Sequence, residues 1–373
     1  MRNDKKIMII GAGDIGRRVF YAMAHSAQAR HLVLAGRDAE AVTRFVNMTR
    51  FSALQCGFTP TLTATVTDLD HVDDTAAQLA AFAPDVVFGA ASVQSWWVLF
   101  NLPKPKFEPL YRAAYGPWLP MHLAPAAKLM RAVRLSGTDA VVVNAAYPDA
   151  VHPLLHADGL SPHVGIGNVA NNVPALRFIA ADRLGVDAAD VLVRFVAHHF
   201  VSHRVSRSGD SGGAAYDLRV FAGGERADVG DEAMLFQPLL TTYRRTGGVG
   251  GQAMTAASAL SVLEPLATGA DVRTHAPGPG GLVGGYPVRI HGGAVALDLD
   301  PAMTEPEAVD VNVAGQRYDG IASIGADGYV EFEDWAAGIM EEELGYTCRR
   351  MHWKEADDRA EELRRKFLEY EAR

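Results

Sequence analysis

The stretch that most constrains the fold runs from Lys6 to Gly16 and reads KIMIIGAGDIG. An apolar run of strand length is followed by a G-x-G-x-x-G pattern, and apolar residues four apart then predict a helix. In a nucleotide-binding fold such glycines permit a tight turn, the approach of a pyrophosphate, and close packing of helix on strand. The pattern predicts a dinucleotide site, the alternative being a glycine turn without a ligand. The candidate residues are Gly11, Ala12, Gly13, Asp14, Ile15 and Gly16.

Strand and helix patterns alternate through the rest of the first 145 residues. This alternation predicts an α/β fold with an N-terminal, doubly wound parallel sheet of the Rossmann type. Two of the expected strands end in candidate cofactor contacts. Asp68 follows a strand at 63–67, near the adenine edge, and the small residues Ala90, Ala91 and Ser92 follow a buried strand at 85–89, where a cofactor could pass close to the backbone.

The tip of the second expected strand, at 31–35, bears on the choice of cofactor. An NAD-specific fold usually places a carboxylate there to bind the ribose hydroxyls. Gly36 occupies the expected position, and Arg37 follows it. Because a guanidinium suits a 2′-phosphate, we expect NADP to be preferred. NAD stays open, since Asp38 would restore the carboxylate after a shift of two residues. Both residues could instead simply begin the next helix.

Length, charge and cysteine content limit the classes of protein that remain. With 373 residues, two domains are the natural expectation. A net charge of −9 argues against a nucleic-acid partner. There is no apolar run of membrane-spanning length, no signal-peptide pattern and no cysteine framework beyond Cys56 and Cys348. We therefore expect a cytoplasmic protein without a membrane partner.

Residues 94–125 form a connection rich in aromatic side chains and prolines. Such segments often serve as lids over enzyme sites, or they are ordinary packing or subunit-contact segments. Further along, alternating apolar residues predict strands at 294–299 and 308–313. The glycine-rich stretch 205–215 predicts a mobile loop.

The stretch 141–186 resembles the lactate/malate dehydrogenase superfamily. It has a buried strand ending in Asn144, Pro148 close behind, a short glycine-containing strand at 163–167, and a long helix that ends in RLGV at 183–186. The resemblance implies a C-terminal α+β catalytic domain and three parts: a cofactor domain at 1–145, a substrate domain at 146–345 and a helical extension at 346–373. We also expect a homo-oligomer, either a dimer or a tetramer.

The resemblance assigns the catalytic histidine to His199. It implies that Asn172 orients the His199 ring and that Asn144 binds substrate or nicotinamide. The family's catalytic aspartate falls on Asn172, and its substrate-binding arginine falls on Ala175. A simple 2-keto acid is therefore not the expected substrate. The competing interpretations of His199 are an ordinary hydrogen-bonded histidine or, together with His203, a metal ligand; we predict no metal site.

Three hypotheses follow for a protein with a small-molecule substrate. The leading one is an NADP-preferring oxidoreductase that moves hydride between nicotinamide and a carbonyl or imine carbon. The second is an enzyme acting on C–N bonds, because 34–38, 66–68 and 85–91 also look like the cofactor domain of saccharopine reductases. The third is a nucleotide sensor without turnover, which the missing aspartate and arginine would suit.

Overall fold

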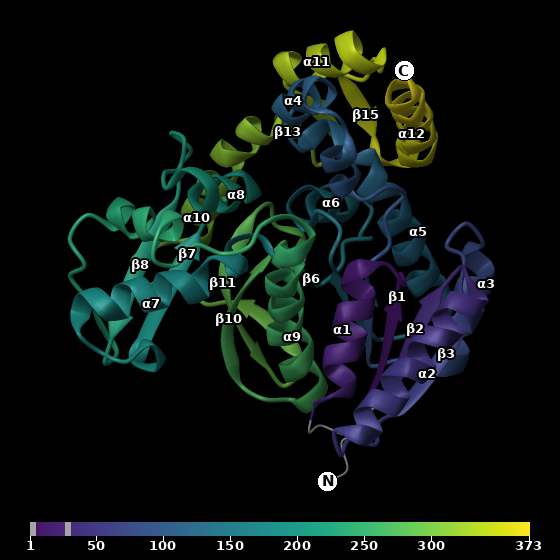
Figure 1. Cartoon of the computed structure of the whole chain (residues 1–373), viewed down its shortest axis with the longest axis horizontal. Coiled ribbons are helices and arrows are strands. Elements are labelled where there is room, and N and C mark those ends of the chain that lie inside the picture. The colour runs from purple at the N-terminus through teal and green to yellow at the C-terminus, as the bar shows by residue number, and fades with distance from the viewer. Residues whose placement is uncertain (1–4, 27–30) are drawn as a thin grey trace.

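The computed structural model describes residues 5–26 and 31–373 and contains a parallel sheet of six strands, ordered β3-β2-β1-β4-β5-β6 (Figure 1). This is the strand order of the doubly wound dinucleotide-binding fold, with its topological switch point between β1 and β4. The predicted α/β class and Rossmann sheet are confirmed. The sheet also includes β6, which lies beyond residue 145. The strands are β1 (Lys6–Ile10), β2 (His31–Gly36), β3 (Thr61–Val66), β4 (Val86–Gly89), β5 (Val141–Asn144) and β6 (Val164–Gly165).

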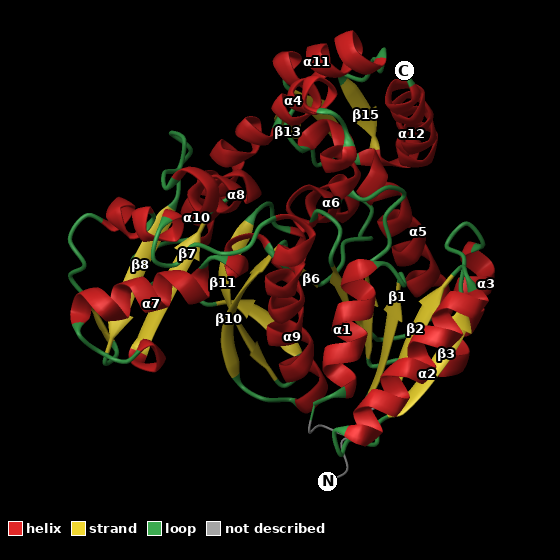
Figure 2. Ribbon diagram, viewed as in Figure 1, coloured by secondary structure: helices red, strands yellow, loops and turns green. Residues whose placement is uncertain are grey.

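Successive residues of the buried strands face opposite sides of this sheet, as the two-residue period of a strand requires. In β1, Ile7 and Ile9 join one hydrophobic cluster, and Met8 and Ile10 join another. The first cluster includes residues of α1 (Asp14–Ala24), α2 (Ala39–Gln55) and α9 (Gln252–Thr268), and the second includes residues of α3 (Val72–Phe82) and α5 (Pro120–Ser136). Figure 2 shows these helices around the sheet. Helices therefore cover both faces and leave the carboxyl ends of the strands as the place for a ligand.

The second half is built from three small antiparallel sheets with helices around them, so the predicted α+β character is confirmed. The sheets are β7 (Val191–Val196), β8 (Asp217–Ala222) and β9 (Glu225–Arg226); β10 (Val272–Pro277), β11 (Gly285–His291) and β12 (Ala294–Leu297); and β13 (Ile321–Ile324), β14 (Tyr329–Phe332) and β15 (Arg350–His352). The helices are α6 (Pro148–His156), α7 (Val173–Leu184), α8 (His199–Ser208), α10 (Glu305–Gln316), α11 (Asp334–Leu344) and α12 (Ala356–Ala372).

Two local predictions are wrong. Residues 308–313 form part of helix α10, because Thr304 and Glu307 make a capping box that starts the helix just before them. Their alternating valines suggested a strand, but buried Ala308 and Asn312, four residues apart, set the helical face. The predicted loop at 205–215 begins only after Ser208, since α8 continues to that residue and ends at Gly209 in the left-handed conformation.

The aromatic stretch folds into short helices, among them α4 (Lys104–Arg112), and packs on the body of the protein. Trp118 is buried and meets Phe367 of α12 edge to face at 5.8 Å. Residues 346–373 thus contribute β15 and a helix that packs against α5 and the aromatic stretch. In the described part of the chain, none of the helices has the length and apolarity needed to cross a membrane.

Candidate active site

The glycine turn between β1 and α1 has the geometry that its pattern predicts. Gly11 has φ of +114°, and a Cβ there would lie 2.6 Å from the carbonyl carbon of Ala90 at the end of β4. A Cβ on Gly16 would lie 1.9 Å from the carbonyl oxygen of Gly11. Around Gly13, by contrast, there is nothing within 4 Å. Two of the glycines are thus required by the protein itself, whereas Gly13 leaves space beside the free amides that begin α1.

At the tip of β2, Gly36 is packed against Ala12 of the glycine turn, where a Cβ would lie 2.8 Å from the Ala12 methyl group. The Asp38 Oδ1 atom accepts a hydrogen bond of 2.9 Å from the Ala41 amide and caps α2. Arg37 is exposed and forms no ion pair with the residues that the structure describes. At the predicted tip, the Arg37 guanidinium therefore has no ion-pair partner among the described residues, and the Asp38 carboxylate is already used as a helix cap.

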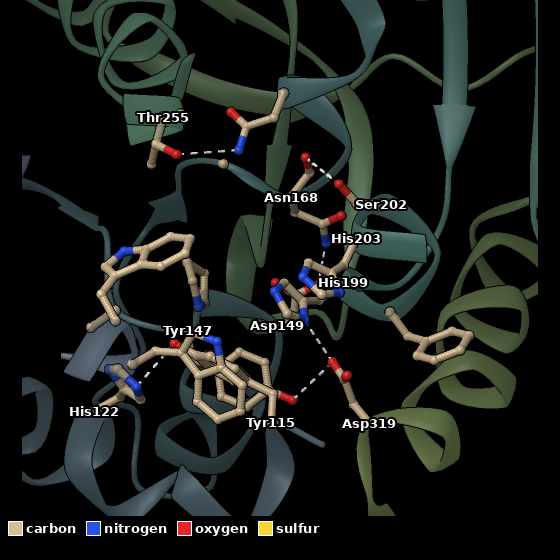
Figure 3. A pocket seen from close by; sticks show the side chains of 18 of the residues that line it. Tyr115, His122, Tyr147, Asp149, Asn168, His199, Ser202, His203, Thr255 and Asp319 are labelled. Carbon is tan, nitrogen blue, oxygen red and sulfur yellow. Dashed lines mark hydrogen bonds and ion pairs between the residues drawn. The ribbon is translucent and has the colours of Figure 1, made fainter. Parts of the chain in front are cut away.

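A cavity of about 920 Å³ lies where the carboxyl ends of β4, β5 and β6 meet α8 (Figure 3). This is where ligands bind in open α/β sheets. Of the predicted cofactor contacts, Ile15, Ala90, Ala91 and Ser92 line it. Asp68 lies apart, with its Oδ1 atom accepting from the Asp70 amide at 3.1 Å.

The central feature of the cavity is an ion pair between His199 and Asp319. The His199 Nδ1 atom donates to the Asp319 Oδ2 atom over 2.7 Å, joining the first turn of α8 to the segment after α10 (Figure 3). The carboxylate side chain is only 6% exposed, but the imidazole side chain is 26% exposed. The Nδ1 atom of the ring is thus bonded to a buried carboxylate, and the ring itself lines the cavity.

This contact sets the protonation of His199. Burial of the ring lowers its pKa, but the charge of Asp319 and the hydrogen bond to it outweigh that effect and raise the pKa above the ordinary 6.5. Burial raises the pKa of Asp319, and its charged neighbour His199 more than reverses this, so that the net shift is downward. The contact therefore favours the charged form of both groups.

The neighbouring histidines behave differently. Burial lowers the pKa of His198 to about 4, and its Nδ1 atom accepts from the Phe200 amide at the start of α8. Burial, with a contribution from Arg207, lowers the pKa of His203 to about 3. Of these three rings, His199 is therefore the one whose surroundings favour the protonated form.

A second buried carboxylate fixes the backbone of His199. The Asp149 Oδ1 atom accepts from the His199 amide at 3.1 Å and also from the Asn168 side chain. A carboxylate suits the N-terminus of α8, where backbone amides lack partners within the helix. Burial raises the pKa of Asp149 to about 6. Asp149 therefore holds the start of the helix that carries His199.

The predictions for Asn172 and Asn144 are wrong. The Asn172 side chain donates to the Ser202 carbonyl and hydroxyl oxygens at 2.7 and 2.9 Å, and Asp319 takes the place beside His199. The Asn144 amide is buried and bonded to Ala146 in its own turn and to His152 on α6. Both asparagines hold loops in place, and the walls of the cavity are made by other residues.

Asp319 is the residue that sequence reasoning missed. It lies 120 residues after His199, and α10 brings it near because Gly315 allows α10 to press against His198. A Cβ on Gly315 would lie 2.5 Å from the His198 Cβ atom. The only local signal is an Asp-Gly pair after a helix, which is common in ordinary turns.

The aromatic stretch forms the part of the cavity wall that adjoins α8. The Tyr115 ring lies 5.0 Å from the His199 ring, and its hydroxyl meets the His122 Nε2 atom at 3.0 Å. Tyr147 reaches the same carboxylate as His199, donating to the Asp319 Oδ2 atom at 3.4 Å. Tyr147 itself has φ of +44°, a conformation that costs energy in a non-glycine residue and is often retained at functional sites. In the described chain, no group of three or more metal-binding side chains could hold an ion.

Comparison with known proteins identifies the fold. No family model and no curated protein matches the sequence. Among solved structures, malate dehydrogenase from Cryptosporidium parvum is similar, with a TM-score of 0.57 at 14% identity over 85% of this chain and 98% of that one. Lactate dehydrogenase from the same organism, in complex with lactic acid and nicotinamide adenine dinucleotide, gives 0.54 at 19% over 86% and 99%. Malate dehydrogenase from Plasmodium falciparum gives 0.54 at 13% over 84% and 95%. The chain has the lactate/malate dehydrogenase fold.

Proposed function

We propose that the protein is a nicotinamide-dependent oxidoreductase that transfers hydride between NADP(H) and a carbonyl or imine carbon, with His199 as the proton carrier. The observation that carries the proposal is the 2.7 Å contact between His199 and Asp319, set in the cavity at the carboxyl ends of the parallel strands. A similar fold in dehydrogenases that act on small molecules supports it.

The bound nicotinamide would supply or accept the hydride. In the direction of reduction, the His199 imidazolium donates its proton from Nε2 to the developing alkoxide or amine, while Nδ1–H stays bonded to Asp319. The buried carboxylate stabilises the positive ring before transfer and holds the ring in one orientation. In the direction of oxidation the neutral ring accepts the proton, and the same carboxylate stabilises the product.

Titration of protein fluorescence with NADPH and NADH, followed by a panel of aldehydes, ketones and cyclic imines, tests the proposal. We expect binding of NADPH and its oxidation by at least one member of the panel. Oxidation by imines alone would favour the C–N enzyme. Tight binding without oxidation by any member would favour the sensor. One reason for the sensor hypothesis was the lack of a carboxylate beside His199, and Asp319 supplies that carboxylate. Absence of binding to either nucleotide would overturn all three.

The fit of a dinucleotide can be tested at the glycine turn itself. Gly13→Val places a side chain in open space, at a φ of −78° that any residue adopts, so the melting temperature should stay unchanged. The same side chain would occupy the path of a pyrophosphate, and we expect the Kd for NADPH to rise roughly tenfold or more, a cost of about 1.4 kcal/mol. Gly16→Ala is the contrasting variant, because its methyl group would meet the Gly11 carbonyl and lower stability by about 1–3 kcal/mol or more. Equal NADPH affinity in Gly13→Val and wild type would contradict a pyrophosphate at this turn.

We propose NADP as the preferred cofactor, supported by the tip of β2. The ribose side offers the Arg37 guanidinium, which forms no ion pair with the described residues, and the next residue in the chain, Asp38, already caps α2. Arg37→Ala should therefore weaken NADPH binding by roughly 10- to 100-fold and leave NADH binding nearly unchanged, because a charge-assisted hydrogen bond contributes about 1.5–3 kcal/mol. Equilibrium titration with both nucleotides measures this. A variant that weakens both equally would show that Arg37 does not read the 2′-phosphate.

We also propose a homo-oligomer. Three large apolar side chains of α2, namely Met48, Phe51 and Leu54, are 47%, 66% and 65% exposed. Exposed apolar groups gathered on one helix are typical of contact surfaces. Sedimentation velocity on the purified chain would distinguish a dimer or tetramer from a monomer.

A further inference from the structure

We propose that the substrate of this site is elongated, with a carboxylate or phosphate at the end remote from the reacting carbon, and that Arg207 binds this group. The inference rests on the proposed oxidoreductase function and adds the class of substrate. It is motivated by how charged side chains are distributed along the cavity.

No arginine of α7 reaches the cavity beside His199. Ala175, where the sequence comparison places a substrate-binding arginine, packs into the hydrophobic cluster under β7. The nearest arginine on the same helix, Arg177, donates to the carbonyl oxygens of Ala188 and Ala189. Helix α7 therefore supplies no arginine to a substrate carboxylate attached directly to the reacting carbon. The usual partner of such a carboxylate is an arginine guanidinium that binds both of its oxygens.

The cavity instead extends along α8. His199, His203 and Arg207 lie four residues apart in succession on one face of the helix, and all three line the cavity. At 1.5 Å per residue, Arg207 is ~12 Å along the helix from His199. The aromatic stretch packs directly against this row and also lines the cavity, with Tyr115 in contact with His199 at 5.0 Å and Tyr111 in contact with His203 at 6.2 Å between ring centroids. The space between the two ends is therefore lined by flat, largely apolar surfaces.

Arg207 is suited to an anion at the far end. Its guanidinium lies 5.2 Å from the centre of the Tyr111 ring and 5.9 Å from that of Phe100, and it donates to the Tyr111 hydroxyl. It has no carboxylate partner among the residues that the structure describes. These aromatic contacts hold the guanidinium in position, and its other N–H groups remain available for an oxyanion.

The other cavity arginines are less suited. Arg317 is paired with Glu333, at 3.6 Å. Arg245 donates to the Asn171 carbonyl and belongs to the exposed loop before α9. Arg112, like Arg207, is exposed and forms no ion pair with the described residues, but it follows Tyr111 on α4 and does not share the row on α8. Arg207 alone combines a restrained side chain with the helix face that carries His199.

The test uses unreactive probes, so that binding is separated from turnover. Two series are prepared, ω-carbamoyl carboxylates and ω-carbamoyl phosphonates of increasing chain length, in which an amide replaces the reacting carbonyl. Calorimetry on the full chain, with and without NADPH, measures the Kd of each. Wild-type affinity should rise to an optimum at chains that span ~12 Å, and the stronger series identifies the anion. Arg207→Ala should weaken the optimal probe roughly 10- to 100-fold and leave the shortest probes unchanged.

Arg204→Ala is the matched control, because Arg204 lies one turn away on α8 but pairs with Asp210. It should leave every Kd unchanged. Three results would each overturn the proposal that Arg207 binds the remote anion: equal affinities in wild type and Arg207→Ala, no binding of the long probes to wild type, or a loss of affinity in Arg245→Ala instead. If the length optimum and the Arg207 effect appear while no carbonyl or imine is reduced, the role of Arg207 stands and the oxidoreductase proposal fails.

Discussion

Replacement of His199 by glutamine is expected to lower kcat by about 10²- to 10⁴-fold, the usual contribution of a positioned proton donor or acceptor. Glutamine retains a polar side chain of similar reach but cannot exchange a proton near neutral pH. NADPH affinity should stay within about twofold, because the predicted contacts of the dinucleotide lie on the turns after β1 and β4. Steady-state kinetics with the best substrate of the panel, together with fluorescence titration, measure both quantities.

His203→Gln is the control for this experiment. His203 lies one turn further along α8 and lines the same cavity, but burial lowers its pKa to about 3. It has no proton to give at neutral pH, so kcat should change by less than about tenfold. If His203→Gln abolished turnover and His199→Gln did not, the assignment of the proton carrier would be wrong.

Asp319→Asn is expected to shift the pH dependence of the reaction. In wild type, burial lowers the pKa of His199, and the Asp319 charge raises it above 6.5. Asparagine removes the charge and leaves the burial, so the pKa of His199 should fall below its ordinary value. Reduction requires the protonated ring, so the rate declines as pH rises through this pKa. The decline should begin at lower pH in the variant, with kcat/KM at neutral pH reduced by roughly 10- to 100-fold and partly restored on acidification.

The same variant has a second signature in stability. His199 has a raised pKa in the folded state, so its contribution is full below 6.5 and is lost as pH rises through the folded pKa. Asp319 has a lowered pKa, so its contribution is present above 3.8 and is lost as pH falls through the folded pKa. The difference in unfolding free energy between wild type and Asp319→Asn should therefore be largest between pH 3.8 and 6.5. A pH–rate profile that coincides with wild type, alongside lowered stability, would reduce Asp319 to a structural role.

The fold could be predicted because its evidence is local. A strand, a G-x-G-x-x-G turn and a helix lie within adjacent residues, and β1, β2, β4 and β5 stand out as largely apolar runs. The failure at 308–313 occurred where a second local signal, a helix cap, outweighed the alternation of apolar residues. The valines at 309, 311 and 313 alternate as in a strand, but the capping box at Thr304 starts a helix before them.

The residues of the candidate site also differ in whether the sequence could predict them. His199 could be proposed because the sequence around it resembles a family that places a histidine there, and Arg37 because it adjoins a strand tip. The partner of His199 could not be found by that route. Counting along α7 led to Asn172, whose amide is bonded to Ser202, whereas the carboxylate comes from a segment 120 residues away.

By itself, the sequence determined the class of fold, and it indicated one glycine turn as the candidate dinucleotide site and one histidine as the candidate proton carrier. Only the tertiary structure decided which carboxylate lies beside that histidine and the shape of the space before it. The physical reason is that strand and turn propensities act between neighbours in the chain, whereas the pKa of His199 depends on a buried charge 2.7 Å away in space. Gly315 and α10 bring that charge to the ring, and α8 together with the aromatic wall sets how far a substrate can extend from it.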